Sequence, residues 1–169
     1  MTLDIDNKNR HYYEFGLNLL IMERITMSDL TPAQLAGQNS FKCVTAGDRE
    51  GWLELFAEEA LVQDPVGVSP LDPSGKGRKG KAAIAEFWDT VISVAGQKEF
   101  TIRESYPADN QVANVVTMLN DLGGGLKATV EMVTVYEVDE EGKVRSLKAY
   151  WDYHKMEAEV IKLMEQAEN

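Results

Sequence analysis

The first well-marked element along the chain is a helix that begins near residue 31. Thr31 stands at the N-cap, Pro32 takes the first helical position, and Gln34 is placed to complete a capping box. Apolar residues then recur at helical spacing as far as Ala46, where Gly47 suits a left-handed stop. The pattern therefore predicts a helix whose two ends are both encoded locally.

Three further elements complete the first half of the chain. Asp48 is placed to cap a second helix, and Trp52 falls on the apolar face of that helix. Residues 60–66 form a predicted strand, and a loop rich in glycine and proline follows over residues 67–80. Apolar residues at helical spacing then predict a third helix over residues 81–95.

The second half of the chain is predicted to be mostly β. Strand-like segments cover residues 100–106, 111–122, 126–138 and 143–152. Glycines 123–125 and the segment Glu140–Gly142 mark hairpin turns, and a polar-ended helix over residues 153–168 closes the chain. Helices followed by an antiparallel meander predict an α+β fold, in which a curved sheet wraps around the N-terminal helices and leaves a concave interior.

The segment Val130–Tyr136 is apolar on both faces of its predicted strand. A strand with one face in water should alternate more clearly between apolar and polar residues. We therefore expect the outer face of the sheet to be covered, and a second copy of the chain is the simplest cover. The expected assembly is a homodimer through the sheet.

Residues 1–26 carry weaker signals than the rest of the chain. A short amphipathic helix fits residues 11–22, and a second plausible start lies at Met27. We expect residues 1–26 to form an N-terminal extension or packing arm. Residues 27–169 are expected to form a single domain.

Charge narrows the range of partners. Acidic residues outnumber basic ones 28 to 17, which gives a net charge of −11. Such a surface repels a phosphate backbone, so nucleic acid and anionic membranes are poor partners. The longest apolar run near the start, Leu19–Met22, is too short for a membrane span or a signal peptide, which favours a cytoplasmic location.

Residues suited to metal, nucleotide or thiol chemistry are sparse. Cys43 is the single cysteine, so an internal disulfide and a multi-thiolate metal site are excluded, and we expect it to be a small core residue. The His, Asp and Glu residues show no metal-ligand spacing, and no glycine-rich loop is suited to phosphate. We therefore expect neither a metal nor a cofactor.

Asp64 is the most informative residue. On a strand over residues 60–66 it shares a face with the apolar residues Ala60 and Val62. A carboxylate on such a face loses hydration, so its pKa should rise, and it would suit a general base that faces a cavity. The alternative is structural, because an aspartate before a proline commonly starts a turn.

The surroundings of Asp64 resemble the steroid Δ5-3-ketosteroid isomerases of the wider nuclear transport factor 2-like (SnoaL-like) superfamily. The segments that carry the resemblance are Asp64-Pro65-Val66-Gly67, Leu55-Phe56-Ala57-Glu58-Glu59-Ala60, Gly80-Lys81-Ala82-Ala83-Ile84, Glu86-Phe87-Trp88 and Gly142–Ala149. The resemblance extends from about Thr31 to Trp151. It implies a cone-shaped fold with an enclosed apolar pocket, dimerisation through the sheet, and Asp64 as the base that moves a proton from the carbon next to a ketone to a carbon two positions away.

The residues that bind the substrate oxygen in that family are replaced here. Where the family has a tyrosine on the first helix and a protonated aspartate on a long strand, this sequence has Ser40 and Thr134. Both hydroxyls are candidates for oxyanion or other polar contacts, although they are weaker donors. Tyr136 shares the strand face of Thr134, and a tyrosine that reached this point from an unexpected position would restore an acidic donor.

The resemblance also implies a set of residues that line the ligand pocket. They are Phe56, Trp88, Thr117, Leu119, Ala149 and Trp151. Ordinary core packing is the alternative for each of these residues, and it is the favoured interpretation for Phe56 and Leu119. The two tryptophans are more telling, because a buried indole N–H needs a hydrogen-bond partner.

A local basic cluster interrupts the acidic sequence. Lys76, Arg78 and Lys79 lie close together in the loop over residues 67–80. A solvated loop explains the cluster, and contact with an acidic tail of the ligand is the alternative.

Three functions remain open. We hypothesise a cofactor-independent isomerase-like enzyme that moves a proton next to a carbonyl in a small, apolar, steroid-like compound, with Asp64 as general base. The alternative is a non-catalytic protein that binds a hydrophobic small molecule on the same fold. The third possibility is a hydrolase or cyclase of the wider superfamily. Epoxide opening in similar proteins needs an acid–arginine–acid cluster. Arg145, the arginine on the late strands, is expected to point outward, which disfavours this possibility.

Overall fold

The computed structural model describes residues 29–167, and the chain divides after Leu30 into two units, of which the second, Thr31–Asn169, is described below. The predicted arm over residues 1–26 lies outside the described residues, so its boundary stays a prediction. The helices of the second unit are α2 (Pro32–Ala46), α3 (Arg49–Glu54), α4 (Lys81–Phe87), the π-helical turn η2 (Trp88–Ile92) and α5 (Tyr153–Ala167). Its strands are β1 (Phe56–Gln63), β2 (Arg78–Lys79), β3 (Gln97–Ala108), β4 (Gln111–Gly123), β5 (Leu126–Val138) and β6 (Val144–Tyr150).

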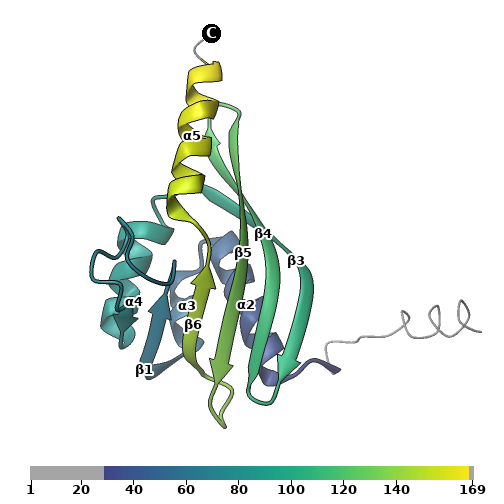
Figure 1. Ribbon diagram of the computed structural model, residues 1–169. Helices are drawn as coiled ribbons and strands as arrows, with labels where there is room; N and C mark the ends of the chain where they lie inside the picture. Colours follow the sequence, from purple (N-terminus) through teal and green to yellow (C-terminus); the bar gives the residue numbers. More distant parts are fainter. Residues whose placement is uncertain (1–28, 168–169) are drawn as a thin grey trace, which may run out of the picture. The chain divides into compact units, whose positions relative to one another are not determined.

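A curved, six-stranded sheet forms the framework of this unit, in the order β2-β1-β6-β5-β4-β3 (Figure 1). The pairs β3–β4, β4–β5 and β5–β6 are antiparallel. β1 instead runs parallel to β6, which corrects the expectation of a fully antiparallel sheet. The long connection from β1 through α4 and the meander permits this parallel pairing. The predicted α+β class, with a curved sheet beside the N-terminal helices, is confirmed.

Helix α2 begins and ends where the sequence predicts. The side chain of Thr31 accepts a hydrogen bond from the backbone N–H of Gln34, and the Gln34 side chain accepts one from the backbone N–H of Thr31. Gly47 ends the helix at a φ of 68°, in the left-handed region that favours glycine. Asp48 then caps α3. These local signals fix the helix that carries Ser40.

Three predicted boundaries differ from the structure. The third helix splits into α4 and the wider turn η2, which ends at Ile92. β1 begins earlier, at Phe56, and its ladder ends at Gln63, so Asp64 follows the strand instead of lying within it. β3 begins at Gln97, three residues before the predicted start at residue 100, because its first residues pair with the end of β4. The prediction had relied on the apolar residues that begin at Phe100.

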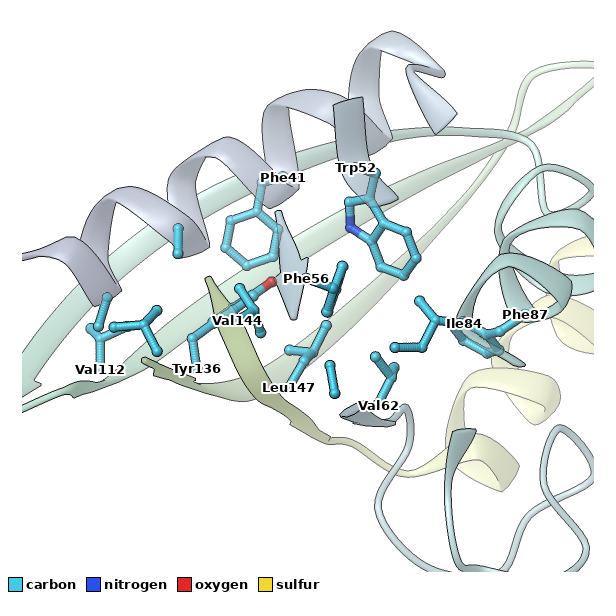
Figure 2. Close-up of a cluster of buried hydrophobic side chains, with 14 of the residues drawn as sticks. Phe41, Trp52, Phe56, Val62, Ile84, Phe87, Val112, Tyr136, Val144 and Leu147 are labelled. Carbon is cyan, nitrogen blue, oxygen red and sulfur yellow. The ribbon is translucent and has the colours of Figure 1, made fainter. Parts of the chain in front are cut away.

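The core lies between the helices and one face of the sheet (Figure 2). Figure 2 shows Phe41 and Trp52 from the helices facing Tyr136 from β5. The Trp52 and Phe56 rings lie 4.6 Å apart, centroid to centroid. All four side chains are buried. This face of the sheet also forms the wall of the cavity.

The opposite face of the sheet carries exposed apolar side chains. Val133 of β5 is 39% exposed, and its partner in the β5–β6 register, Tyr150, is 47% exposed. The outer face of the apolar segment predicted on β5 is therefore accessible in one chain. Its cover by a second copy stays a prediction.

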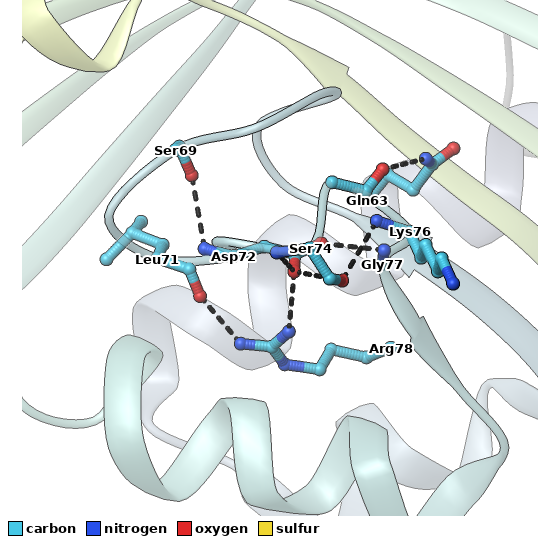
Figure 3. Close-up of polar contacts among 9 residues, drawn as sticks. Gln63, Ser69, Leu71, Asp72, Ser74, Lys76, Gly77 and Arg78 are labelled. Carbon is cyan, nitrogen blue, oxygen red and sulfur yellow. Dashed lines mark hydrogen bonds and ion pairs between the residues drawn. The ribbon is translucent and has the colours of Figure 1, made fainter.

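The loop between β1 and β2 is held together by Asp72 (Figure 3). The Asp72 carboxylate accepts hydrogen bonds from the backbone N–H and hydroxyl of Ser74 and from the backbone N–H of Gly77. Arg78 Nη1 lies 3.5 Å from Asp72 Oδ1, and Arg78 Nη2 donates to the carbonyl of Leu71 over 2.6 Å. Arg78 therefore organises the loop, which accounts for one member of the basic cluster without a ligand tail.

Candidate functional site

A largely apolar cavity lies between the inner face of the sheet and residues of α2, η2 and α5. Its volume is about 260 Å³, just below the roughly 300–1,000 Å³ typical of small-molecule pockets. The apolar wall includes Phe41, Leu71, Phe87, Met118, Met132 and Met156. The predicted apolar pocket is thus present and has the size for one compact ligand.

The polar groups on the cavity wall are few. Among the described residues, the charged or phenolic groups that line it belong to Asp64, Lys98, Tyr136 and Tyr153. The neutral groups with a hydroxyl or amide are Ser40, Thr134 and Asn120, together with the indoles of Trp52 and Trp151. A cavity of this kind orients a ligand through a small number of hydrogen bonds.

Asp64 lies directly after β1, is half-buried and lines the cavity. The indole N–H of Trp151 donates to Asp64 Oδ1 over 2.6 Å. Loss of hydration raises the pKa of Asp64, while the Trp151 hydrogen bond and the charge of Lys98 oppose this rise. Within residues 29–167 the hydrogen-bond partner of Asp64 is this indole and not a backbone N–H of a turn, so the turn-capping alternative receives no support.

Ser40 and Tyr136 meet at the wall of the same cavity. Ser40 Oγ accepts a hydrogen bond from Trp52 Nε1 over 2.9 Å, and the Tyr136 hydroxyl lies 3.1 Å from Ser40 Oγ. Burial raises the pKa of Tyr136 well above its usual value, the Ser40 hydrogen bond opposes this, and the charge of Asp64 adds to it. A tyrosine from β5 therefore presents its hydroxyl beside the serine that occupies the family's tyrosine position.

Thr134 lies on the same strand face as Tyr136 and is also part of the cavity wall. Its side chain is buried, and within residues 29–167 its Oγ1 has no hydrogen-bond partner. Buried polar atoms are nearly always paired, so the unpaired hydroxyl of Thr134 is unusual.

The positions implied by the family resemblance fall in two groups. Ala149 and Trp151 are part of the cavity wall, and their contact with a ligand stays a prediction. The other four are not among the residues that line this cavity, so the structure gives their predicted contact with a ligand no support. Phe56 and Trp88 are buried in the core. Thr117 and Leu119 lie on the face of β4 opposite the cavity residue Met118. On that outer face the Thr117 hydroxyl donates a hydrogen bond to Glu131. The four predicted pocket residues that do not line the cavity are thus Phe56, Trp88, Thr117 and Leu119.

Sequence reasoning missed several cavity residues, among them the polar pair Lys98 and Asn120. Both occupy inward positions at one end of the β3–β4 pair, where they are partners in register. Period-two spacing counted back from Phe100 would have placed Lys98 on the inner face, but the predicted strand began too late to include it.

Neither a cluster of metal-ligating side chains nor a membrane-spanning helix is found in the part of the chain that the structure describes. Within residues 29–167, no group of three or more His, Cys, Asp or Glu side chains is arranged to hold a metal ion. The helices described there also lack the length and apolar character needed to cross a bilayer.

A curved α+β sheet with a carboxylate inside an apolar cavity defines a ketosteroid isomerase-like protein of the nuclear transport factor 2 superfamily. The model of the SnoaL-like domain matches residues 38–147. The chain belongs to this SnoaL-like family.

Curated relatives include two different enzymes. The steroid Delta-isomerase of Nocardioides simplex is 26% identical over 120 residues, which cover 64% of this chain and 80% of that protein. The epoxide hydrolase LasB of Streptomyces lasalocidi is 28% identical over 113 residues, which also cover 64% of this chain. That match spans only 37% of LasB, so the chain corresponds to little more than a third of that protein.

Similar solved structures include a ketosteroid isomerase and a protein bound to a steroid ester. The Δ5-3-ketosteroid isomerase from Mycobacterium sp. is 37% identical, with a TM-score of 0.68, and the match covers 74% of this chain and 96% of that one. RV0760c from Mycobacterium tuberculosis, solved in complex with estradiol-17beta-hemisuccinate, is 36% identical with the same TM-score of 0.68. That match covers 75% of this chain and 98% of RV0760c.

Proposed function

We propose that the protein is a cofactor-independent, ketosteroid isomerase-like enzyme that moves a proton next to the carbonyl of a small, apolar, steroid-like compound. The observation that carries this proposal is the Asp64 carboxylate, hydrogen-bonded to Trp151 inside an apolar cavity. A carboxyl group with a raised pKa suits both removal and return of a proton near neutral pH.

The proposed reaction conserves all atoms of the substrate. The Asp64 carboxylate removes a proton from the carbon between the carbonyl and a neighbouring C=C bond. The released electron pair forms a new C=C bond, and the carbonyl electrons move to oxygen, which gives a dienolate. The protonated Asp64 then returns the proton to the far carbon of the original double bond, and the carbonyl re-forms in conjugation with the shifted double bond.

Tyr136 is the proposed donor to the developing oxyanion, with Thr134 as a second donor. An indole N–H can only donate, so Trp52 uses Ser40 Oγ as its acceptor. In the structure the Tyr136 hydroxyl donates to Ser40 Oγ. In the proposed substrate complex Ser40 instead turns its own hydroxyl proton toward the Tyr136 oxygen, which leaves the Tyr136 proton for the substrate oxygen. This chain of donors would replace the family's tyrosine with one from a different element.

A homodimer in the cytoplasm completes the proposal. The apolar pair Val133 and Tyr150 on the outer face of the sheet supports association through that face. The net charge of −11 supports a partner that is a small molecule and not a nucleic acid or an anionic membrane.

A non-catalytic binding protein is the second candidate. The raised pKa of Tyr136 favours it, because burial makes this hydroxyl a weaker acid and therefore a poorer oxyanion donor. An epoxide hydrolase receives less support, since Arg145 is exposed, lies 3.9 Å from Glu137 and is not among the cavity residues.

Isomerisation of an unconjugated 3-ketosteroid, followed by the ultraviolet absorbance of the conjugated product, tests the proposal. Wild-type turnover that falls at least about 10³-fold in Asp64→Asn supports it. The exposed Asp89→Asn, which removes a carboxylate paired with Arg49, serves as the matched control. Calorimetric steroid binding without turnover would support the binding protein instead, and turnover that Asp64→Asn leaves unchanged would remove Asp64 from its role.

A further inference from the structure

The proposed proton transfer leaves one polar part of the cavity unused. Lys98 of β3 and Asn120 of β4 are partners in register, so their side chains emerge next to each other on the inner face. Both are part of the cavity wall, and they are 9% and 8% exposed. Burial of a charged group and an amide beside apolar side chains costs free energy unless their polar atoms are hydrogen-bonded. The hydrogen bonds of Lys98 and Asn120 therefore have to be accounted for.

Two of the three N–H donors of the Lys98 ammonium have partners within the chain. Nζ donates to the carbonyl of Ile92 over 2.7 Å and to the carbonyl of Gly96 over 3.0 Å. An ammonium group has three donors, so one remains beyond these two bonds. The carbonyls hold Nζ in place at the end of η2, which fixes the direction available to the third N–H.

Asn120 supplies an acceptor at the same place. Its Oδ1 is buried and has no hydrogen-bond partner within residues 29–167. A Cβ atom built on Gly96 would lie 3.3 Å from this Oδ1, and Gly96 is also the residue whose carbonyl binds Lys98. An unused donor and an unused acceptor therefore belong to two register partners that line one cavity.

This polar pair is separated from the Tyr136 hydroxyl by aromatic rings. The Phe41 ring stacks on Phe100 at 4.7 Å and meets Tyr136 edge-on at 6.0 Å, centroid to centroid. Phe100 is the next inward residue after Lys98 on β3. The wall between the two polar ends is therefore apolar and aromatic, which suits a fused-ring ligand.

Asp64 interacts electrostatically with both ends. Burial lowers the pKa of Lys98, and the charge of Asp64 opposes this lowering; burial raises the pKa of Tyr136, and the charge of Asp64 adds to that rise. Asp64, Lys98 and Tyr136 all line the same cavity. A ligand that lies past Asp64 would therefore present one end to Tyr136 and the other to Lys98.

We propose that Lys98 and Asn120 form a subsite for a hydroxyl group at the end of the ligand opposite its carbonyl. A hydroxyl oxygen accepts a hydrogen bond from Lys98 Nζ, and its proton is donated to Asn120 Oδ1, so both unused groups are satisfied at once. A carboxylate has no proton to donate to Oδ1 and adds a second negative charge near Asp64. The inference rests on the proposed function for the orientation of the ligand, but not on turnover.

Binding of two steroids that differ by a single hydroxyl tests this subsite. Androst-4-en-3-one and its 17β-hydroxy derivative already hold the conjugated double bond, so titration calorimetry measures affinity alone. We expect the 17β-hydroxy compound to bind wild-type protein about 10-fold or more tightly, as for a hydrogen bond to a charged group. In Asn120→Leu and Lys98→Met this preference should fall below about 3-fold.

Asn114→Leu is the matched control. Asn114 lies on the same strand and is buried, its Nδ2 has no partner within residues 29–167, and it is not among the cavity residues. This variant should keep the full preference for the hydroxyl. Asn120→Leu also removes an unpaired buried acceptor, so its ligand-free form should melt no lower than wild type, which separates lost recognition from lost folding.

The outcomes that overturn the inference differ from those that overturn the proposed function. Equal affinity for the two steroids in wild type, or a preference that survives Asn120→Leu, would overturn the subsite alone. Tighter binding of the 17β-hemisuccinate ester than of the alcohol would overturn the hydroxyl in favour of a carboxylate. Failure of both steroids to bind would overturn the subsite together with the proposed ligand class, whereas lost turnover with the hydroxyl preference intact would overturn only the proposed reaction.

Discussion

Trp151 and Asp64 are joined by a 2.6 Å hydrogen bond although they lie far apart in the sequence. Asp64 follows β1 and Trp151 follows β6, and these two strands are parallel neighbours. The ends of parallel strands meet at the same edge of a sheet, and Gln63 is paired with Lys148 in that register. The backbone N–H of Val66 adds a 2.8 Å bond to the carbonyl of Ala149 just beyond it. The one parallel pairing therefore builds the carboxylate–indole pair.

Asp64→Asn should make the folded protein more stable at neutral pH. Because burial raises the pKa of Asp64, the folded state holds its proton over a pH range in which the unfolded chain has lost it. The free energy of unfolding therefore falls as pH rises through that range, and an amide avoids this loss. We expect a higher melting temperature at pH 8, by about 2–4 °C per kcal/mol regained, and no gain at pH 3. A variant that melts lower at pH 8 would show that the carboxylate is well solvated.

Trp151→Phe should move the acidic limb of the pH–activity profile upward. The indole hydrogen bond favours the charged form of Asp64 and opposes the rise of its pKa. Its loss should shift the limb of kcat/KM by about one pH unit for each 1.4 kcal/mol of lost stabilisation. Trp88→Phe, which removes an indole at a core position away from the cavity wall, should leave the limb in place. An equal shift in both variants would argue against direct control by Trp151.

Tyr136→Phe should lower turnover with little effect on substrate binding. The change removes only the hydroxyl that we place at the substrate oxygen, so kcat should fall by about 10²–10³ while KM changes by a few-fold at most. Steady-state kinetics with an unconjugated 3-ketosteroid measures both constants. A loss confined to KM would assign Tyr136 to binding and not to the transition state.

Ser40→Ala should destabilise the protein more than Tyr136→Phe does. Ser40 Oγ accepts the buried indole N–H of Trp52, and its removal leaves that donor unpaired at a cost of about 1–3 kcal/mol. Tyr136→Phe leaves the Trp52–Ser40 bond intact. Chemical denaturation of both variants provides the comparison, and equal stability would indicate that another group takes over the indole N–H.

Loss of Asp72 should loosen the loop that carries Leu71. Hydrogen bonds from Ser74 and Gly77, with the charge of Arg78, lower the pKa of Asp72. The stability that this carboxylate contributes is therefore present above its ordinary pKa near 4 and is lost as pH falls below it. In Asp72→Ala we expect faster limited proteolysis within residues 67–80 at pH 7 and weaker ligand binding, because Leu71 is part of the cavity wall. Wild-type protein should show the same proteolytic sensitivity only at acidic pH.

Local signals made part of this fold predictable. The capping box at Thr31 and the glycine stop at Gly47 define α2 without tertiary information, and the hairpin glycines define the turn between β4 and β5. Alternation along the strand after α3 also placed Asp64 on the cavity side, although the ladder ends one residue earlier. Each of these features depends on neighbours within a few residues.

Long-range pairings explain what the sequence did not reveal. The parallel contact of β1 with β6 joins segments from opposite ends of the domain, and no local pattern encodes it. Thr117 and Leu119 were placed in the pocket by family resemblance, yet the strand period puts them on the outer face opposite Met118. The meeting of Ser40 with Tyr136 likewise depends on how α2 lies against β5, which only the assembled sheet determines.

Exchange of a substrate proton with solvent tests the central claim most directly, because it reports proton removal whatever the later steps. Nuclear magnetic resonance in D₂O would follow the hydrogen on the carbon between the carbonyl and the double bond of an unconjugated 3-ketosteroid. We predict that wild-type protein accelerates the replacement or transfer of this hydrogen. Asp64→Asn should still bind the steroid, but the hydrogen should then be replaced only at the uncatalysed rate. Equal rates for wild type and Asp64→Asn would contradict the assignment of Asp64 as the base.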